Sequence, residues 1–232
     1  MAQHIKRLLT PHFWKIPKKG LQFAVSPRPG PHPARACIPL GIAVRDILKL
    51  AETGREVRRL LSAGEVLVDR KKRTDQKLPV GLFDVVEFPK ANKHYRVVPS
   101  LEGLELKEIK ESEAAWKLCQ IRGKTTGKGM VQLNLHDGRC ILVNEGEAKR
   151  YKVSDTLKIS LPGQKIEDHM PFRKGAKAVI FAGKNTGMEG AIKEIAERKT
   201  MLEKSSVVIS AEGKDIRTIK DYVMATGHMA GK

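Results

Sequence analysis

The chain has 232 residues and carries 44 Lys+Arg against 26 Asp+Glu, a formal net charge of +18. Hydrophobic residues make up 41% of it, which excludes a fully disordered chain, and the 5% of aromatic residues predicts small aliphatic cores. The excess of cations predicts a polyanionic partner, because each neutralised phosphate releases a counterion. The alternative is a soluble protein that is merely alkaline.

The excess charge is unevenly distributed. Residues 1–35 hold seven cations and no acid, and residues 36–100 hold 13 cations against 8 acids. Residues 101–170 are nearly balanced, with 12 against 11, and residues 171–232 return to 12 against 7. Three basic regions therefore bracket a neutral one.

Neither a membrane protein nor a disulfide framework is indicated. No apolar run approaches the roughly 20 residues that span a bilayer, and the basic N-terminus lacks the apolar region of a secretory signal. The cysteines Cys37, Cys119 and Cys140 are far apart and form no C-x-x-C pair. We therefore expect a reducing, cytoplasmic compartment and no structural zinc.

We expect residues 1–36 to form a basic extended arm. Five of the 14 residues from Ser26 to Pro39 are proline, which prevents a helix or a central strand. Phe13, Trp14 and Phe23 lie between lysines, a pattern typical of segments that follow a phosphate backbone while their rings stack on bases. The alternative is a disordered tail. Since the arm has no core of its own, we expect it to be unfolded without RNA.

Helical periodicity opens the second region, which we bound at residues 37–92. Apolar residues recur at i, i+3, i+4 and i+7, which places them on one helical face: Val44, Ile47, Leu48 and Ala51. Thr53 and Glu56 have the spacing of a capping box, so a second helix is expected to begin there and to end at Gly64. Gly54 makes the joint between the helices.

The second helix carries a basic face. Its arginines are three or four residues apart: Arg55, Arg58 and Arg59. Strands are expected at 65–69 and 84–88, with a basic turn at 70–73 after the first. A helix pair that presents arginines beside a small sheet fits an RNA-binding module.

The remainder of the chain is expected to be mainly β. Residues 93–170 form an all-β middle domain, in which Asp137-Gly138 marks a hairpin turn. Its strands are expected at 117–121, 130–135, 140–143, 155–159 and 164–166, after a strand and a short helix within 101–115. Residues 171–232 hold short strands at 176–181, 190–195 and 207–209 with a glycine-bounded loop at 183–187, which suggests an SH3-like barrel and a C-terminal tail. The fold class is therefore α+β, mainly β.

Catalytic motifs fail on their spacing. Gly123–Gly129 resembles a phosphate-binding loop, but three residues instead of four separate its first glycines and glycine follows the last lysine. His136-Asp137 has no evident third partner, and the histidines lack metal-ligand spacing. The five glutamates within 102–113 fit a solvated face. We expect no enzyme, no cofactor and no metal.

Several motifs of the arm together resemble one known family, the archaeal and eukaryotic e-type family of small-subunit ribosomal protein four. They are His4-Ile5-Lys6-Arg7, Pro11-His12-Phe13-Trp14, Gly20-Leu21-Gln22-Phe23-Ala24, Arg28-Pro29-Gly30-Pro31-His32 and Pro39-Leu40. Thr53-Gly54-Arg55-Glu56-Val57 is similar to the helix-turn-helix step of the S4-type RNA-binding domain. Eukaryotic members have Asp-Gly in the following turn, where this chain has Asp69-Arg70, so its turn type stays open.

The resemblance continues to the C-terminal region. Lys117–Arg122 and His136–Arg139 match the middle domain, and 174–192 resembles a KOW motif. The resemblance implies a structural, non-catalytic constituent of the small ribosomal subunit, whose partners are ribosomal RNA and neighbouring ribosomal proteins and not a membrane or a small-molecule substrate. The residues expected to contact RNA are Lys6, Arg7, Lys15, Lys18, Lys19, Arg28, Arg35, Arg55, Arg58, Arg59, Arg70, Lys71, Lys72, Arg73, Lys184 and Asn185.

Two alternatives to a ribosomal protein remain. One is a stand-alone regulatory RNA-binding protein that uses the same modules outside the ribosome. The other is an RNA-modifying enzyme, which would need a catalytic domain of roughly 150 residues beside the RNA-binding block. Residues 90–232 instead divide into small β units without a nucleophile.

Overall fold

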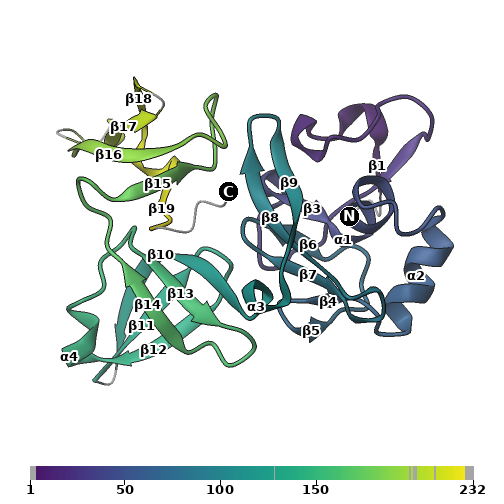
Figure 1. Cartoon of the computed structure of the whole chain (residues 1–232), viewed down its shortest axis with the longest axis horizontal. Coiled ribbons are helices and arrows are strands. Elements are labelled where there is room, and N and C mark those ends of the chain that lie inside the picture. The colour runs from purple at the N-terminus through teal and green to yellow at the C-terminus, as the bar shows by residue number, and fades with distance from the viewer. Residues whose placement is uncertain (1–3, 128, 199, 201–202, 212, 228–232) are drawn as a thin grey trace. The chain divides into compact units, whose positions relative to one another are not determined.

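The computed structural model describes residues 4–127, 129–198, 200, 203–211 and 213–227. The chain divides into two compact units (Figure 1). The first comprises 1–98, 102–117 and 160–163, and the second comprises 99–101, 118–159 and 164–232. Strands dominate in both, as the sequence predicts. No helix in the described part of the chain has the length and apolarity needed to cross a membrane.

The first unit is built on a five-stranded sheet in the order β5-β4-β7-β8-β9. Its strands are β4 (Leu67–Val68), β5 (Lys71–Lys72), β7 (Val85–Phe88), β8 (Lys93–Ser100) and β9 (Gly103–Ile109). Two shorter ribbons pair β1 (His4–Lys6) with β2 (Phe23–Val25) and β3 (Cys37–Pro39) with β6 (Pro79–Gly81). The helices are α1 (Leu40–Ile42), α2 (Gly54–Ser62) and α3 (Glu111–Ala114), with single 3-10 turns at Arg7–Leu9, His12–Trp14, Ala34–Ala36 and Pro89–Ala91.

Helix α2 begins and ends where its capping residues predict. The Glu56 N–H donates to Thr53 Oγ1 at 3.3 Å, and the Thr53 N–H donates back to the Glu56 carboxylate at 3.4 Å. Gly64 has φ +69°, and the N–H groups of Gly64 and Glu65 close the last turn on Leu61 and Leu60. This is the Schellman arrangement, in which a left-handed residue favours glycine.

The first helix is displaced toward the N-terminus from its predicted position. It begins at Leu40 and continues as a π-turn over Ala43–Ile47, instead of reaching Ala51. Lys49 takes φ +53°, which is incompatible with a continuing helix. Val44 and Ala51 are nevertheless buried, and the Leu50 N–H donates to the Val44 carbonyl at 3.0 Å.

The turn between β4 and β5 has two left-handed residues. Asp69 has φ +52° and Arg70 has φ +63°, the signature of a type I′ two-residue hairpin. Strand β4 is shorter than the expected 65–69, since Asp69 already takes the left-handed conformation of the turn, although its N–H still donates to the Val85 carbonyl at 2.9 Å. The Asp69 carboxylate accepts the Val85 N–H at 3.0 Å.

The arm is folded against the rest of the first unit, in contrast to the unfolded arm that its lack of a core predicts. The Trp14 side chain is 1% exposed, and its Nε1–H donates to the Cys37 carbonyl at 2.9 Å. Phe13 packs on Gly103, where a Cβ would lie only 2.4 Å from the phenylalanine. The arm has no independent core, but it uses that of the neighbouring elements.

A buried ion cluster joins distant segments of the first unit. Lys117 Nζ lies 3.0 Å from Asp69 Oδ2 and 2.5 Å from Asp84 Oδ1, and all three side chains are at most 7% exposed. His32 Nε2 lies 3.0 Å from the other oxygen of Asp84. The ring of His32 covers Gly81, where a Cβ would lie 2.3 Å from it. The proline-rich segment is thereby attached to the sheet.

The second unit contains two five-stranded antiparallel sheets. The first has the order β12-β11-β10-β13-β14, with a core that includes Leu133, Leu157 and Ile159. Its elements are β10 (Trp116–Gly127), β11 (Met130–Leu135), β12 (Cys140–Asn144), α4 (Glu145–Ala148), β13 (Thr156–Ser160) and β14 (Ile166–Met170). The predicted strand 130–135 is confirmed at both ends.

The second sheet of this unit has the order β18-β17-β16-β15-β19 around Ile180, Ile192 and Ile209. It comprises β15 (Lys177–Ile180), β16 (Glu189–Ala196), β17 (Ser206–Ala211), β18 (Lys214–Ile219), a 3-10 turn at Lys220–Tyr222, and β19 (Val223–Ala225). Strands β18 and β19 lie where the sequence predicted only a C-terminal tail, so that prediction is wrong for 214–225. Strand β19 is buried and pairs with β15, where Ile180 lies opposite Val223, 43 positions further along the chain. A pattern among neighbouring residues does not reveal a pairing over that distance.

Candidate nucleic-acid interface

Helix α2 presents a surface of arginines. The side chains of Arg55, Arg58 and Arg59 are all exposed, while Val57 and Leu61 hold the opposite face of the helix in the core. Arg58 Nε donates to the Gly54 carbonyl at 3.2 Å, and the capping box fixes the first turn. The predicted basic face is therefore present and is supported by a rigid helix.

The hairpin of β4 and β5 adds further cations next to the end of α2. Lys71 and Lys72 are exposed, and a Cβ at Gly64 would lie 3.3 Å from Lys72 Cδ. The Lys72 stem therefore passes over the residue that terminates α2, where a cation is favoured by the helix dipole. Helix and hairpin together form what we call the α2–β5 surface: Arg55, Arg58, Arg59, Lys71 and Lys72.

The two other cations of this hairpin are less accessible. Arg70 and Arg73 are half-buried. Arg70 Nε lies 3.4 Å from Oε1 of Glu87, a side chain only 1% exposed. Burial raises the pKa of Glu87, and the neighbouring Arg70 guanidinium and the His94 side chain oppose that rise. Arg70 thus has a structural partner beneath the surface.

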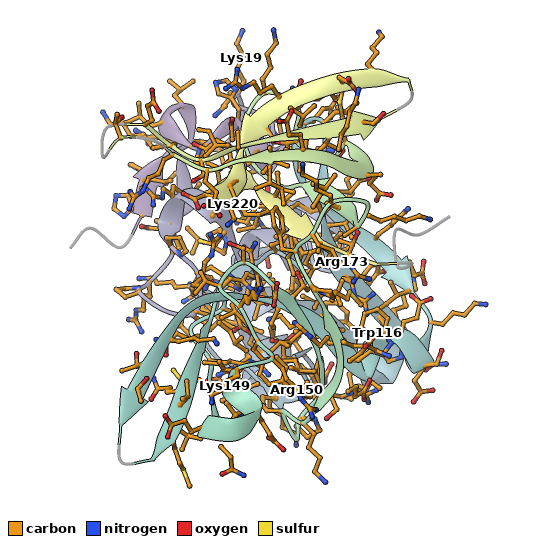
Figure 2. All side chains as sticks on the ribbon, turned by 90° about the vertical axis from the view of Figure 1, so that its left-hand side faces the viewer. Lys19, Trp116, Lys149, Arg150, Arg173 and Lys220 are labelled. Carbon is orange, nitrogen blue, oxygen red and sulfur yellow. The ribbon has the colours of Figure 1, made fainter. Side chains whose placement is uncertain are left out.

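Some cations of the arm are exposed to solvent, and others are bonded inside the fold. Lys6, Lys15 and Lys19 are exposed, and Lys15 Nζ lies 3.4 Å from Glu102 and 3.7 Å from Glu105. Figure 2 shows the Lys19 side chain extending outward from the ribbon.

Two other cations of the arm are engaged inside it. The Lys18 ammonium donates to the carbonyl and hydroxyl of Thr10. Arg7 is 3% exposed, and its guanidinium donates to Asp46 at 2.9 Å and to the Pro17 carbonyl at 2.6 Å. The Arg7 guanidinium therefore stabilises the fold of the arm.

Both arginines of the proline-rich segment are exposed. Arg28 makes a solvent-exposed ion pair with Asp75 at 3.1 Å, and Arg35 lies on a 3-10 turn. An exposed pair of this kind contributes little to stability, so Arg28 can exchange its partner for a phosphate at small cost.

In the second unit, the glycine-bounded loop places Lys184 in solvent and leaves Asn185 half-buried. Gly183 and Gly187 both have positive φ, and the Thr186 hydroxyl donates to the Gly183 carbonyl at 2.6 Å. The loop is thus a shaped turn that presents one lysine. Lys128, the other cation of the 123–129 loop besides Lys124, lies outside the described residues.

Other cations of the second unit were not predicted as contacts. Lys149 and Arg150 are exposed at the end of α4, where Figure 2 shows them close together. Arg173 is exposed, and Lys220 Nζ lies 5.6 Å from the centroid of the Phe172 ring. The adjacent Lys149-Arg150 pair in the sequence could have indicated the first two, whereas the Lys220–Phe172 contact depends on strand pairing.

One group of potential metal ligands comes together among the described residues, namely Cys119, His136 and Asp137, with ligand atoms within 4.8 Å of one another. The sequence analysis missed the cysteine as the third member. Asp137 accepts the Arg139 N–H at 3.2 Å and lies 3.1 Å from Arg139 Nε. His136 Nδ1 accepts the Gln120 N–H at 3.2 Å. Because these atoms already have partners and a guanidinium adjoins the carboxylate, the group fits a structural role in the hairpin.

Comparison with known proteins agrees with this organisation. The family model described as "Ribosomal family S4e" matches residues 91–166, an RS4NT domain matches 1–35, and an S4 domain matches 46–86. The last range contains α2, β4 and β5.

Full-length relatives show the same relationship. Small ribosomal subunit protein eS4 of Methanothermobacter thermautotrophicus is 42% identical, covering 97% of this chain and 92% of that protein. The protein of the same name from Methanocaldococcus jannaschii is 43% identical over 97% of this chain and 94% of its own length. The crystal structure of 30S ribosomal protein S4e from Thermoplasma acidophilum superimposes with a TM-score of 0.69 at 33% identity, covering 82% of this chain and 94% of that one. The chain belongs to the S4e family of small-subunit ribosomal proteins.

Proposed function

We propose that this protein is a structural, non-catalytic constituent of the small ribosomal subunit that binds ribosomal RNA and thereby supports translation in the cytoplasm. The observation that carries this proposal is the α2–β5 surface within the part of the chain that matches the S4 domain. Its five cations are exposed, and rigid backbone on both elements holds them in place. Of the predicted regions 1–36, 37–92, 93–170 and 171–232, the second extends past residue 92 in this proposal, because β8 and β9 complete its sheet.

The contacts of this surface are to phosphates. Arginine and lysine side chains neutralise phosphates, and such contacts position a protein without reading bases. The deep major groove of A-form RNA is closed to side chains, so recognition rests on shape. The exposed cations of the arm and of the glycine-bounded loop extend the interface: Lys6, Lys15, Lys19, Arg28, Arg35 and Lys184.

The candidate residues that are half-buried or bonded within the protein contribute less to this interface than the exposed cations. Lys18, Arg70, Arg73 and Asn185 can reach RNA only at the rim of the surface. Arg7 is assigned to the fold because Asp46 and Pro17 occupy its guanidinium. Neighbouring ribosomal proteins are further partners, whereas a membrane and a small-molecule substrate have no place in the proposal.

A salt titration tests the proposal. The triple variant R55Q/R58Q/R59Q is compared with wild type for binding to small-subunit ribosomal RNA transcribed in vitro. Losing three phosphate contacts should reduce the slope of log affinity against log salt by about 2 to 3. The matched control is K107Q/K110Q/K165Q, which removes three exposed lysines from the neutral region and should leave the slope nearly unchanged.

Sedimentation of cell lysate separates the ribosomal role from a regulatory one. A ribosomal constituent stays in the small-subunit peak at equal stoichiometry as salt rises. An unchanged salt slope in the triple variant would contradict the proposed surface. Release of the wild-type protein from the peak at moderate salt would instead favour a stand-alone RNA-binding regulator.

A further inference from the structure

The arm exposes large apolar side chains where its charge is highest. Among the described residues, Leu8 is 71% exposed, Leu9 76%, Leu21 56% and Phe23 43%. We call these four residues the apolar tip. They make up half of the strongly exposed large hydrophobic side chains that the described chain carries. The first acidic residue of the sequence is Asp46, so no carboxylate lies within the arm itself.

The β1–β2 ribbon brings the members of the apolar tip to one end. Lys6 pairs with Phe23 as the last ladder position, and the Arg7 N–H donates to the Gln22 carbonyl at 2.9 Å. Leu8 and Leu21 therefore lie just beyond the paired residues of the two strands, at the same end of the ribbon. The His4 ring contacts Phe23 edge-on, with centroids 4.4 Å apart.

Buried groups on both sides hold the two leucines outward. Arg7 and Thr10 flank them and are both 3% exposed. The Thr10 hydroxyl donates to the Arg7 carbonyl at 2.7 Å, and the Lys18 ammonium donates in turn to Thr10. Since Arg7 is also bonded to Asp46, the turn that carries Leu8 and Leu9 is fixed from beneath. The exposure of the leucines is a property of an ordered turn.

These apolar side chains cannot bind phosphates, but they can pack on the faces of nucleobases. In a continuous duplex each base is covered by its neighbours, so a leucine has nothing to cover there. At a bulge, an internal loop or a helix end, a base face is open and apolar, and wedge residues of nucleic-acid-binding proteins occupy such steps. The cations Lys6 and Lys19 lie in the same segment and can contact the adjoining phosphates.

We propose that the apolar tip covers the face of an unpaired or unstacked base in RNA, so that the arm selects an interrupted helix over a continuous one. This inference rests on the proposed function and specifies the kind of RNA structure that the arm binds. A protein neighbour is the less favoured occupant, because it would have to supply carboxylates to the exposed cations Lys6, Lys19 and Arg35 of the arm. RNA supplies one phosphate with every nucleotide.

Two RNA hairpins of equal length test the preference. One has a continuous stem, and the other carries a two-nucleotide bulge in which 2-aminopurine replaces one adenine. Wild-type protein should bind the bulged hairpin at least about tenfold more tightly, and its binding should change the 2-aminopurine fluorescence. The variant L8S/L9S should lose both effects and keep the affinity of wild type for the continuous stem.

The control is L142S, which removes a leucine of similar exposure, 64%, from β12. It should behave as wild type. A bulge preference that persists in L8S/L9S, or that wild type lacks while binding both hairpins, would overturn the inference and leave the proposed function intact. Failure of wild type to bind any RNA would overturn the proposed function.

Crosslinking identifies the occupant directly. Leu9→p-benzoylphenylalanine is introduced into the full chain, which is assembled into small subunits and irradiated. We expect a crosslink to ribosomal RNA at or beside an unpaired nucleotide. A crosslink to a ribosomal protein, a crosslink within a continuous duplex, or no crosslink to RNA would contradict the inference.

Discussion

Replacing Lys117 by methionine removes the ammonium from the buried ion cluster and keeps most of the side-chain volume. Lys117 Nζ contacts Asp69 at 3.0 Å and Asp84 at 2.5 Å, and its side chain is 1% exposed. Breaking a buried ion pair from one side costs about 3–5 kcal/mol, because a desolvated charge is left behind. We therefore expect the free energy of unfolding to fall by about 3–5 kcal/mol at pH 7 in K117M.

The loss depends on pH in a defined direction. Burial opposes ionisation of Asp84, but the Lys117 ammonium and His32 outweigh it and hold the pKa of that carboxyl far below its usual range. A depressed carboxyl pKa contributes stability above the unfolded-state value of about 3.9 and loses it as the pH falls. Without the ammonium this pKa rises. The difference between wild type and K117M should therefore be largest near neutral pH and narrow as the pH falls toward and below about 4.

Urea unfolding followed by tryptophan fluorescence measures this effect. Both tryptophans, Trp14 and Trp116, belong to the first unit, so the signal reports the unit that contains the cluster. The control K107M changes an exposed lysine and should stay within about 0.5 kcal/mol of wild type. K117M/D84N removes one stranded charge and should recover part of the loss. A loss below about 1 kcal/mol at pH 7, or one that does not vary with pH, would refute the reasoning.

Three further predictions concern the arm, the type I′ turn and the thiols. W14F keeps an apolar ring but removes the hydrogen-bond donor to the buried Cys37 carbonyl. The free energy of unfolding should therefore fall by about 1–3 kcal/mol, and limited proteolysis should cleave the arm sooner than in wild type. Equal protease resistance of the two proteins would contradict the docked arm. R70G relieves a left-handed arginine, which is worth about 1 kcal/mol, but removes the guanidinium beside buried Glu87. Because the pKa of Glu87 is raised, acidification favours its neutral form, so the stability that R70G loses relative to wild type should shrink as the pH falls. Urea curves at pH 8 and pH 4 measure this, and an equal loss at both values would contradict the reasoning. Burial raises the pKa of Cys37 to about 12, so a thiol reagent at pH 8 should label exposed Cys140 rapidly and Cys37 only on unfolding; rapid labelling of Cys37 would refute this.

The RNA-contact candidates show how far charge alone predicts a surface. The prediction that the cations of α2 lie on one exposed face is confirmed, because the capping box defines where the helix begins and their spacing then defines the face. Arg7 has the same local pattern of charge as Lys6, yet one is buried and the other exposed. What separates them is Asp46, 39 residues further along the chain. No periodicity around residue 7 encodes that partner.

Local sequence patterns predicted the features whose interacting partners are a few residues apart. The capping box at Thr53 and Glu56, the glycine that ends α2, and the alternating strand from Met130 to Leu135 are of this kind, since local hydrogen bonds and side-chain alternation depend only on near neighbours. Only the tertiary structure decided that the arm is docked and that Lys117 neutralises carboxylates 33 and 48 residues away. A lysine that is buried in the fold and a lysine that is free to contact RNA cannot be told apart from the sequence around them. Their environments differ only in the folded protein, where distant carboxylates surround the first and solvent surrounds the second.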